Sequence, residues 1–316
     1  MSLAFPSTPS MIPPAKPTER PTMKRTIRTA LASIILGLTG SLSAEEGEKP
    51  APKTIKLWPE GKASIGAGEF ENANATLTIF RPQEPNGTAI VICPGGGYGQ
   101  VVGAEGAPIA RWLNTQGIVG IVLNYRLPKG NPHRPLSDVR RALRMTRMRA
   151  ADWNIKRNRI GVMGFSAGGH LAAMAATKFD LDARKTSDPI RQESSRPDFA
   201  ILVYPVITMG PGTHGGSRNN LLGPNPGEEL IRLYSNELQV TAKTPPTFLT
   251  HAADDRPVPP RNSEKFHQAL SAKKVPAKYL PLASGGHGLN GYQGPMWDAW
   301  QTQSMQWLTA LAAASK

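Results

Sequence analysis

One serine of this chain, in the segment Gly164-Phe165-Ser166-Ala167-Gly168, has the neighbours that a catalytic nucleophile needs. A serine hydroxyl is a weak nucleophile until a base takes its proton and an acid fixes that base. Where a strand turns sharply into a helix, in the turn called a nucleophile elbow, the residues two before and two after the serine must be small. The glycines at these two places therefore predict Ser166 as the nucleophile.

Candidates for the acid and the base follow Ser166 in the chain order that this arrangement requires, which is serine, then acid, then histidine. Asp254 and Asp255 lie in the segment HAADDRPVP, after a short apolar strand. His287 lies in SGGHG, after the last expected strand. The residues alone favour His287 as the base and leave both aspartates open as the acid.

The other histidines have weaker claims to the role of base. His170 comes one helical turn after Ser166, whereas the base is expected late in the chain. His251 ends a strand, where packing is the expected role. The remaining three lie in polar segments with no partner group in the nearby sequence: His133, His214 and His267. Since no two histidines have the H-x-x-x-H spacing, we expect no metal site.

Strands and helices alternate around these residues. Residues 159–165 form a short apolar run and residues 167–177 are rich in alanine without proline, so a buried strand and then a helix are expected around Ser166. This alternation predicts an α/β fold with a mostly parallel sheet and helices on both faces. The other expected strands are 75–80 (an edge strand), 88–93, 118–124, 199–204, 247–251 and 278–282, and the other expected helices are 107–116, 137–153, 228–236, 262–273 and 296–313.

The expected helix 137–153 begins at Ser137, a residue type that favours helix N-termini. Its apolar residues recur at helical spacing on one face. Arg140, Arg144 and Arg147 lie on another face. Such a stripe of arginines can bind a polyanion, but a solvated helix surface is the interpretation that we favour.

A long connection, residues 205–245, separates two expected strands. Its first half is rich in proline and glycine. Because a loop of this length inside a compact domain usually has a function, we expect a cap over the site.

The N-terminus predicts export. Residues 1–22 have a Pro/Ser/Thr-rich, disordered composition, or result from a misassigned start. Residues 23–44 combine basic residues, about a dozen apolar residues and then small residues, which is typical of a secretory signal peptide. We therefore expect a secreted or periplasmic protein with one domain, residues 45–316, and no stable membrane insertion after signal cleavage.

The formal net charge of the chain is +14. Because five basic residues and one acidic residue lie within 1–44, their removal leaves +10. Such a protein can associate with acidic polysaccharide, but nucleic acid is not expected as a partner because no reader motif accompanies the dispersed basic residues. Cys93 is the only cysteine, which excludes an intramolecular disulfide. The sequence indicates no cofactor.

Seven segments, taken in order, resemble a known family: PGGGYG, NYRLP, GFSAGGHLA, RPDFAILVYPVI, TPPTF, HAADDRPVP and GGHG. Together they resemble the α/β-hydrolase esterases, in particular the secreted bacterial group related to acetyl esterases and acetylxylan esterases. The resemblance extends from about residue 55 to the C-terminus. It implies an eight-stranded α/β-hydrolase sheet and hydrolysis of carboxylic esters through an acyl-enzyme.

The resemblance also implies the roles of the residues. Ser166 matches the nucleophile and His287 the base. The family pattern H-x-x-x-D-x-x-V is set here by His251 and Val258, which selects Asp255 as the acid. Asp254 is then expected to stabilise the loop, as an acceptor for backbone N–H groups.

The oxyanion donors implied by the resemblance are the backbone N–H of Ala167 and that of Gly96 or Gly97. In the lipase-like branch of these enzymes a histidine precedes the glycines, whereas this chain has Pro94. This difference leaves open which glycine donates. We also expect Tyr98, next to these glycines, to contact the substrate.

The expected function is a secreted serine esterase that removes acetyl or other small acyl groups from a small ester or an acetylated polysaccharide such as xylan. Two alternatives stay open. One is a serine peptidase of the prolyl oligopeptidase type, which carries similar motifs. The other is a non-catalytic polysaccharide-binding protein with a hydrolase fold, although such a protein has no need of the ordered serine, aspartate and histidine.

Overall fold

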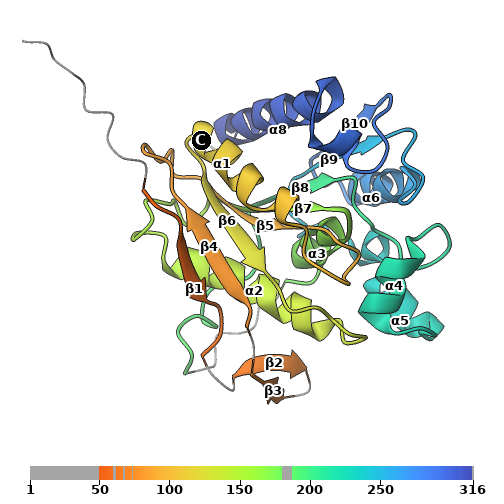
Figure 1. Cartoon of the computed structure of the whole chain (residues 1–316), viewed down its shortest axis with the longest axis horizontal. Coiled ribbons are helices and arrows are strands. Elements are labelled where there is room, and N and C mark those ends of the chain that lie inside the picture. The colour runs from red at the N-terminus through yellow and green to blue at the C-terminus, as the bar shows by residue number, and fades with distance from the viewer. Residues whose placement is uncertain (1–49, 60–61, 67, 73, 180–186, 315–316) are drawn as a thin grey trace, which may run out of the picture. The chain divides into compact units, whose positions relative to one another are not determined.

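A single large sheet organises the part of the chain that the structure describes. Its strands are β1 Lys53–Lys56, β4 Thr76–Phe80, β5 Ala89–Cys93, β6 Val119–Asn124, β7 Ile160–Phe165, β8 Phe199–Val203, β9 Thr247–Ala252 and β10 Ala277–Leu282. Among the described residues these eight strands pair in the order β1-β4-β6-β5-β7-β8-β9-β10 (Figure 1). The six strands from β6 to β10 in this order pair in parallel, and β4 pairs antiparallel with both of its neighbours. The predicted eight-stranded, mostly parallel sheet is confirmed.

The computed structural model describes residues 50–59, 62–66, 68–72, 74–179 and 187–314. These residues belong to one compact unit, Gly47–Lys316. The predicted leader, residues 1–22, and the predicted signal peptide, residues 23–44, lie outside the described residues. Within the described parts of the chain, no helix has both the length and the apolar character needed to cross a bilayer.

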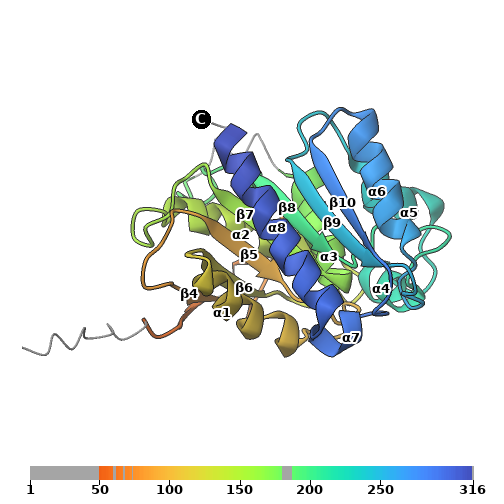
Figure 2. The same cartoon turned by 90° about the horizontal axis from the view of Figure 1, so that it is seen from above.

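Helices cover both faces of the sheet (Figure 2). One face packs against α1 (Ala107–Thr115) and α8 (Pro295–Ala314), and the other packs against α2 (His133–Met148), α3 (Ser166–Thr177) and α6 (Arg261–Ala272). The side chains of the central strands β5, β7, β8 and β9 are buried on both faces, because there neither face of the sheet meets water. In β5, Ile90 and Ile92 belong to the apolar cluster with α1 and α8, whereas Val91 belongs to the cluster on the opposite face.

The edge of the sheet differs from the sequence prediction. The strand predicted over residues 75–80 lies inside the sheet as β4, and the shorter β1 forms the edge. Three of the four β1 residues are exposed, and only Ile55 is partly buried against the core. A strand that buries so little has no apolar alternation to reveal it in the sequence.

Helix α2 begins four residues before the predicted Ser137, at His133, and ends at Met148 rather than near Trp153. Pro132 precedes the helix and Pro135 lies in its first turn. Proline is compatible with the first turn because the N–H groups there have no partner within the helix. The sequence reasoning placed the start after these prolines, and this was wrong.

The arginine stripe of α2 is not a solvated surface, and this expectation is corrected. Arg144 and Arg147 are each only 6% exposed. Nε of Arg144 donates to the carbonyl of Glu193 at 3.0 Å, and Nη1 of Arg147 donates to that of Ser194 at 2.6 Å. Arg140 donates to the carbonyl of Lys178. These guanidinium groups therefore bind the backbone of neighbouring loops.

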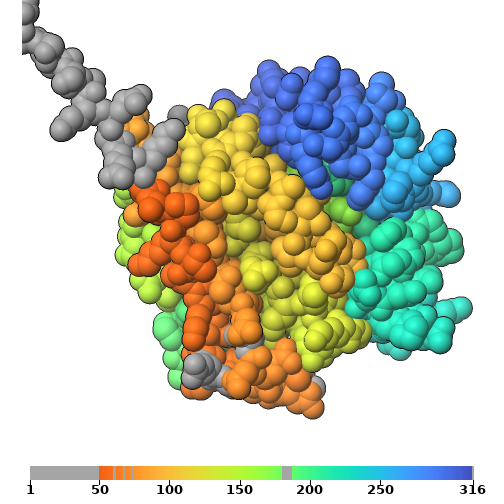
Figure 3. All heavy atoms as spheres, in the orientation of Figure 1, coloured from red at the N-terminus to blue at the C-terminus, as the bar shows by residue number. Residues whose placement is uncertain are grey.

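Two further features were missed or only partly predicted. Residues 205–245 contain α4 (Gly215–Leu222), α5 (Glu228–Tyr234) and a 3₁₀ turn, η2 (Asn236–Gln239), of which only the region of α5 was predicted. Helix α4 begins with two glycines, which are weak helix formers. A hairpin of β2 (Ala63–Gly66) and β3 (Glu69–Glu71) lies at the outer edge of the molecule, in orange at the bottom of Figures 1 and 3.

Candidate active site

Ser166 lies at the turn between β7 and α3, in the conformation that its neighbours predicted. Its φ of +53° is in the left-handed region that residues with a side chain rarely adopt. A Cβ added to Gly164 would lie 2.1 Å from the carbonyl oxygen of Gly168, and one added to Gly168 would lie 2.0 Å from that of Cys93. Both positions therefore require glycine, and the tight turn lifts the serine above the end of the sheet.

The structure brings Ser166, His287 and Asp255 together in one hydrogen-bonded row, the catalytic row, which takes its name from the role that the sequence predicts. Oγ of Ser166 lies 2.8 Å from Nε2 of His287, and Nδ1 of His287 lies 2.8 Å from Oδ2 of Asp255. Because a carboxylate only accepts, Nδ1 carries the proton and Nε2 is left to accept the serine proton. Ser166 is 7% exposed and the His287 side chain 28% exposed. This arrangement can activate the serine for attack on a carbonyl carbon.

The buried carboxylate of Asp255 has three hydrogen-bond donors. Oδ1 accepts the backbone N–H of Val258 at 3.0 Å, and Oδ2 lies 3.2 Å from Nε2 of the buried His251 as well as facing His287. Burial alone would raise the pKa of Asp255, but the hydrogen bonds from the two imidazoles and from Val258 lower it to about 2. Asp255 is therefore ionised at neutral pH.

The neighbouring Asp254 has a different role in the structure. Its exposed carboxylate accepts the backbone N–H of Gly286 at 2.8 Å and that of Gly285 at 3.3 Å. These hydrogen bonds, that of Gly286 first, lower the pKa of Asp254. Asp254 thus holds the loop that carries His287, and of the two aspartates that sequence reasoning first left open, Asp255 is the one that contacts the imidazole.

The glycine-rich loop after β5 lies next to the first turn of α3, because Gly168 packs directly on the backbone of Cys93 and Pro94. Gly96 has a φ of +119°, and a Cβ there would lie 2.4 Å from the carbonyl oxygen of Gln100. The N–H groups at the start of α3 have no acceptor within the helix and carry its positive dipole. Ala167 and the glycine loop can therefore supply N–H donors to a developing oxyanion. That they do so, and whether Gly96 or Gly97 donates, stay predictions.

Tyr98 does not lie where the sequence reasoning expected a substrate contact. Its side chain is only 1% exposed, and its hydroxyl lies 2.9 Å from Nδ1 of His170. Nε2 of His170 donates to the carbonyl of Tyr234 at 2.8 Å, so Nδ1 accepts from the tyrosine. Burial lowers the pKa of His170 to about 4. The ring of Tyr98 faces the core beneath the glycine loop, and His170 is a packed, neutral histidine.

Two residues near the catalytic row were missed. Glu105 is 3% exposed and accepts the N–H of Gly95 at 2.6 Å. Its signal in the sequence was weak: it is the only acidic residue in positions 85–137. His214 precedes α4, and its Cε1 lies 3.8 Å from the position of a Cβ on Gly97. Burial lowers the pKa of His214, and the nearby His287 lowers it further.

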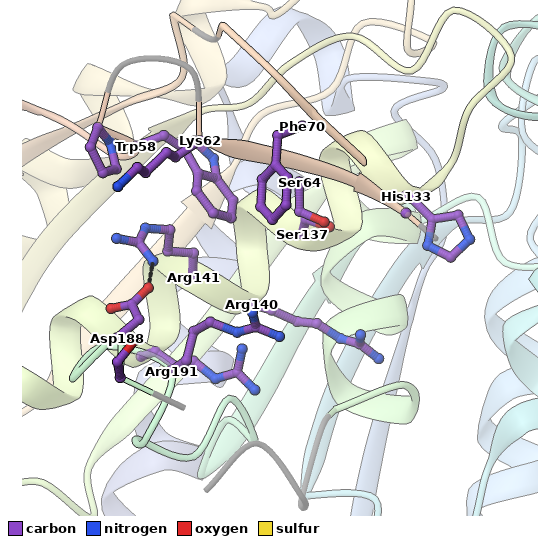
Figure 4. Close-up of a pocket in the computed structure, with 14 residues that line it drawn as sticks. Trp58, Lys62, Ser64, Phe70, His133, Ser137, Arg140, Arg141, Asp188 and Arg191 are labelled. Carbon is purple, nitrogen blue, oxygen red and sulfur yellow. Dashed lines mark hydrogen bonds and ion pairs between the residues drawn. The ribbon is translucent and has the colours of Figure 1, made fainter. Parts of the chain in front are cut away.

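A cavity of about 370 Å³ lies away from these residues, between the β2–β3 hairpin and α2 (Figure 4). Figure 4 shows Phe70 and Ser64 of the hairpin facing Arg140 of the helix, and the ion pair of 2.7 Å between Arg141 and Asp188. None of the three residues of the catalytic row lines this cavity. Among the described residues, no group of three or more His, Cys, Asp or Glu side chains could hold a metal ion.

Comparison with known proteins places this geometry in context. Residues 77–270 match the model of a family described as BD-FAE. The chain is 36% identical over 253 residues, 77% of its length, to an acetylxylan esterase of Xylanibacter ruminicola. It is 37% identical over 215 residues, 67% of its length, to endo-1,4-beta-xylanase B of Butyrivibrio fibrisolvens. The matches cover 50% of the first relative and 34% of the second, so the chain matches only part of each.

A solved structure resembles the chain over most of its length. It is the acetyl ester-xyloside bifunctional hydrolase of Caldicellulosiruptor lactoaceticus, with a TM-score of 0.77 and 38% sequence identity. The alignment covers 84% of this chain and 98% of that one. Both the sheet order and this similarity confirm the α/β-hydrolase fold.

Proposed function

Because this chain belongs to the BD-FAE family of α/β-hydrolase esterases, we propose that it is a secreted serine esterase that removes acetyl groups from a carbohydrate. The observation that carries the proposal is the row of two 2.8 Å hydrogen bonds from Ser166 through His287 to Asp255. Neither the acetyl group nor the carbohydrate follows from the row itself. They are proposed from the names of the acetylxylan esterase and of the acetyl ester-xyloside hydrolase.

The proposed reaction has two halves. His287 takes the proton of Ser166 as Oγ attacks the carbonyl carbon of the ester, and the oxygen of that carbonyl becomes an oxyanion beside the N–H of Ala167 and the glycine loop. The C–O bond to the alcohol then breaks, and His287 gives its proton to the leaving oxygen. Water, deprotonated by the same imidazole, cleaves the acyl-enzyme, releases the acid and restores the serine.

The alcohol side of the ester is proposed to be a sugar hydroxyl, and His214 and Asn220 of the 205–245 segment are polar residues near the glycine loop that are suited to contact it.

Release of acetate from acetylated xylan and from 4-nitrophenyl acetate, compared with cleavage of peptide substrates, tests the proposal. We expect hydrolysis of both esters and none of the peptides. The Ser166→Ala protein should keep its fold and lose nearly all turnover, because only the covalent step is removed. Peptide cleavage without ester hydrolysis, or full turnover by Ser166→Ala, would refute the proposal.

Export is proposed from the composition of residues 23–44, which has the basic, apolar and small-residue order of a signal peptide. N-terminal sequencing of the protein isolated from its native host tests this directly. We expect the mature chain to begin near Ala44 or Glu45. A chain that begins at Met1 and is recovered from the cytosol would contradict both the cleavage and the export.

A further inference from the structure

A buried carboxylate, Glu105, joins the glycine-rich loop to the part of the chain that carries His287. Glu105 ends a 3₁₀ turn, η1 (Gly103–Glu105), that follows the glycine loop. Oε2 accepts the N–H of Gly95 at 2.6 Å. Oε1 accepts the hydroxyl of Tyr204 at 2.9 Å and that of Tyr292 at 3.2 Å. One side chain therefore binds three segments that lie far apart in the sequence.

The two tyrosines connect Glu105 to the base. Tyr204 follows β8, and its ring packs edge-on against the imidazole of His287, with the ring centres 5.0 Å apart. Tyr292 ends the short α7 (Leu289–Tyr292), which begins two residues after His287. A change in the position of Glu105 would thus move both the ring that packs on the imidazole and the chain that carries it.

The charge of Glu105 acts on the same imidazole. Burial raises the pKa of Glu105, while the N–H of Gly95, the tyrosine hydroxyls and the nearby His287 act against this rise. Glu105 accepts three hydrogen bonds and donates none, as an ionised carboxylate does. Only Tyr204 separates it from the imidazole, since that hydroxyl binds Oε1 and that ring packs on His287. A carboxylate in this place favours the protonated form of His287. That form arises when the imidazole takes the serine proton, so the charge is placed where positive charge develops during the reaction.

We propose that Glu105 is a positioning residue that fixes the glycine loop and His287 relative to each other. As an anion in addition to Asp255, it also stabilises the protonated imidazole. This inference rests on the proposed serine esterase mechanism. Glu105 does not touch the substrate; it acts through Gly95 on the loop and through Tyr204 and Tyr292 on the base.

Other charged groups also face His287, and the sign of the expected effect depends on all of them. Asp255 hydrogen-bonds to it, and Asp254 binds the backbone of its loop. His214, next to α4, interacts with it as a like charge when both are protonated. In Glu105→Gln these groups are unchanged. Loss of one negative charge alone makes protonation of His287 less favourable, so its titration should move to lower pH.

The decisive variant is Glu105→Gln, because an amide keeps the shape of the side chain and removes the charge. Its oxygen can accept the N–H of Gly95, and its NH₂ group can donate to the two tyrosine oxygens, which then accept where they donate in the wild type. The midpoint of the His287 titration, followed by NMR, should fall by about 0.5–1 pH unit. The acid limb of kcat/KM should move by the same amount, and kcat should fall about 3- to 10-fold with KM little changed.

Asp138→Asn is the matched control. Asp138, on α2, is fully buried and forms an ion pair with Arg126 at 2.7 Å. It also accepts the indole N–H of Trp58, and it does not contact the catalytic row. This variant should lose stability and leave the titration of His287 unchanged. If Asp138→Asn moves that titration as far as Glu105→Gln does, the effect is not specific to Glu105 and the proposal is wrong.

Tyr292→Phe tests the positioning role separately, and decides it even if Glu105→Gln fails to fold. It removes the hydroxyl that binds Oε1 of Glu105 and leaves the charge of Glu105 in place. Because the chain that carries His287 then loses one contact, kcat should fall several-fold while the His287 titration does not change. Unchanged kcat in Tyr292→Phe, or an unchanged titration in folded Glu105→Gln, would overturn the inference. If the His287 titration falls in Glu105→Gln as predicted but the wild-type protein hydrolyses no ester, the proposed function is refuted instead.

Discussion

The backbone N–H of Val258 donates to Oδ1 of Asp255 at 3.0 Å, which fixes the carboxylate so that Oδ2 faces His287. The carbonyl of the same Val258 accepts Nε2 of His251 at 2.8 Å. The pattern H-x-x-x-D-x-x-V is therefore a closed set of contacts. His251 and Val258 hold the aspartate, which gives a physical reason for the spacing that selected Asp255.

Asp255→Asn should reduce kcat on the order of 10⁴-fold, the loss known for the same change in the serine-protease triad, because an asparagine stabilises the wrong tautomer of the histidine. Asp254→Asn should cost less than about 10-fold, since the amide oxygen can still accept one N–H of the His287 loop. Steady-state kinetics on 4-nitrophenyl acetate, with circular dichroism to establish folding, distinguishes the two. The reverse ranking would make Asp254 the acid.

Gly168→Ala should disrupt the tight turn between β7 and α3 that carries Ser166. The added methyl would lie 2.0 Å from the carbonyl oxygen of Cys93 and 2.3 Å from that of Pro94, so the backbone of the glycine loop or of α3 must move. We expect a loss of stability of about 3 kcal/mol or more, together with loss of turnover. Gly103→Ala is the control, because nothing lies within 4 Å of its added Cβ. Thermal unfolding and activity are the measurements, and a fully active Gly168→Ala would contradict the geometry.

Arg147→Ala should destabilise the protein without changing the chemistry. The variant leaves the backbone carbonyls of Arg157, Ser194 and Arg196 without their buried donor. The expected cost is about 3 kcal/mol, measured by urea unfolding. Arg149→Ala is the matched control, because Arg149 is exposed and paired with Asp152 at 3.0 Å. This change should lower the free energy of unfolding by less than about 1 kcal/mol. Equal costs for the two arginines would restore the solvated-surface interpretation.

Stability should fall as the pH is lowered from about 6.5 to about 4, because His170 titrates at its ordinary pKa when unfolded but only at about 4 when folded. Between these pH values the unfolded chain binds a proton at His170 that the folded chain does not bind. The free energy of unfolding is therefore unaffected by His170 above pH 6.5 and falls as the pH approaches 4. The change should be on the order of 3 kcal/mol. Urea unfolding at several pH values measures it, and His170→Gln should flatten the dependence. An equal slope in that variant would assign the effect to other groups.

Chain order and spacing predicted the parallel sheet and the elbow, and the resemblance predicted that Ser166, His287 and Asp255 meet, because each depends on a local pattern. The long-range contacts left no such pattern. The sequence around Arg147 predicts a surface residue, whereas in the structure the loop of residues 194–198 covers it. Glu105 has no signature because its partners, Tyr204 and Tyr292, lie about 100 and 190 positions away. Tyr98 was expected at the substrate because it adjoins the glycines, but the turn directs its ring into the core.

The segment of residues 205–245 is hydrogen-bonded to the glycine loop and to helix α6. Nδ2 of Asn220 donates to the carbonyl of Gly97 at 2.9 Å, and Oδ1 of Asn262, on α6, accepts the N–H groups of Ile207 and Thr208 at 3.0 and 3.2 Å. Both ends of the segment join buried strands, β8 and β9, that pair with each other independently of it. The segment is thus a separable unit. Under the proposed esterase function, a replacement segment that keeps these hydrogen bonds should change which alcohols are accepted without rebuilding the sheet or the catalytic row.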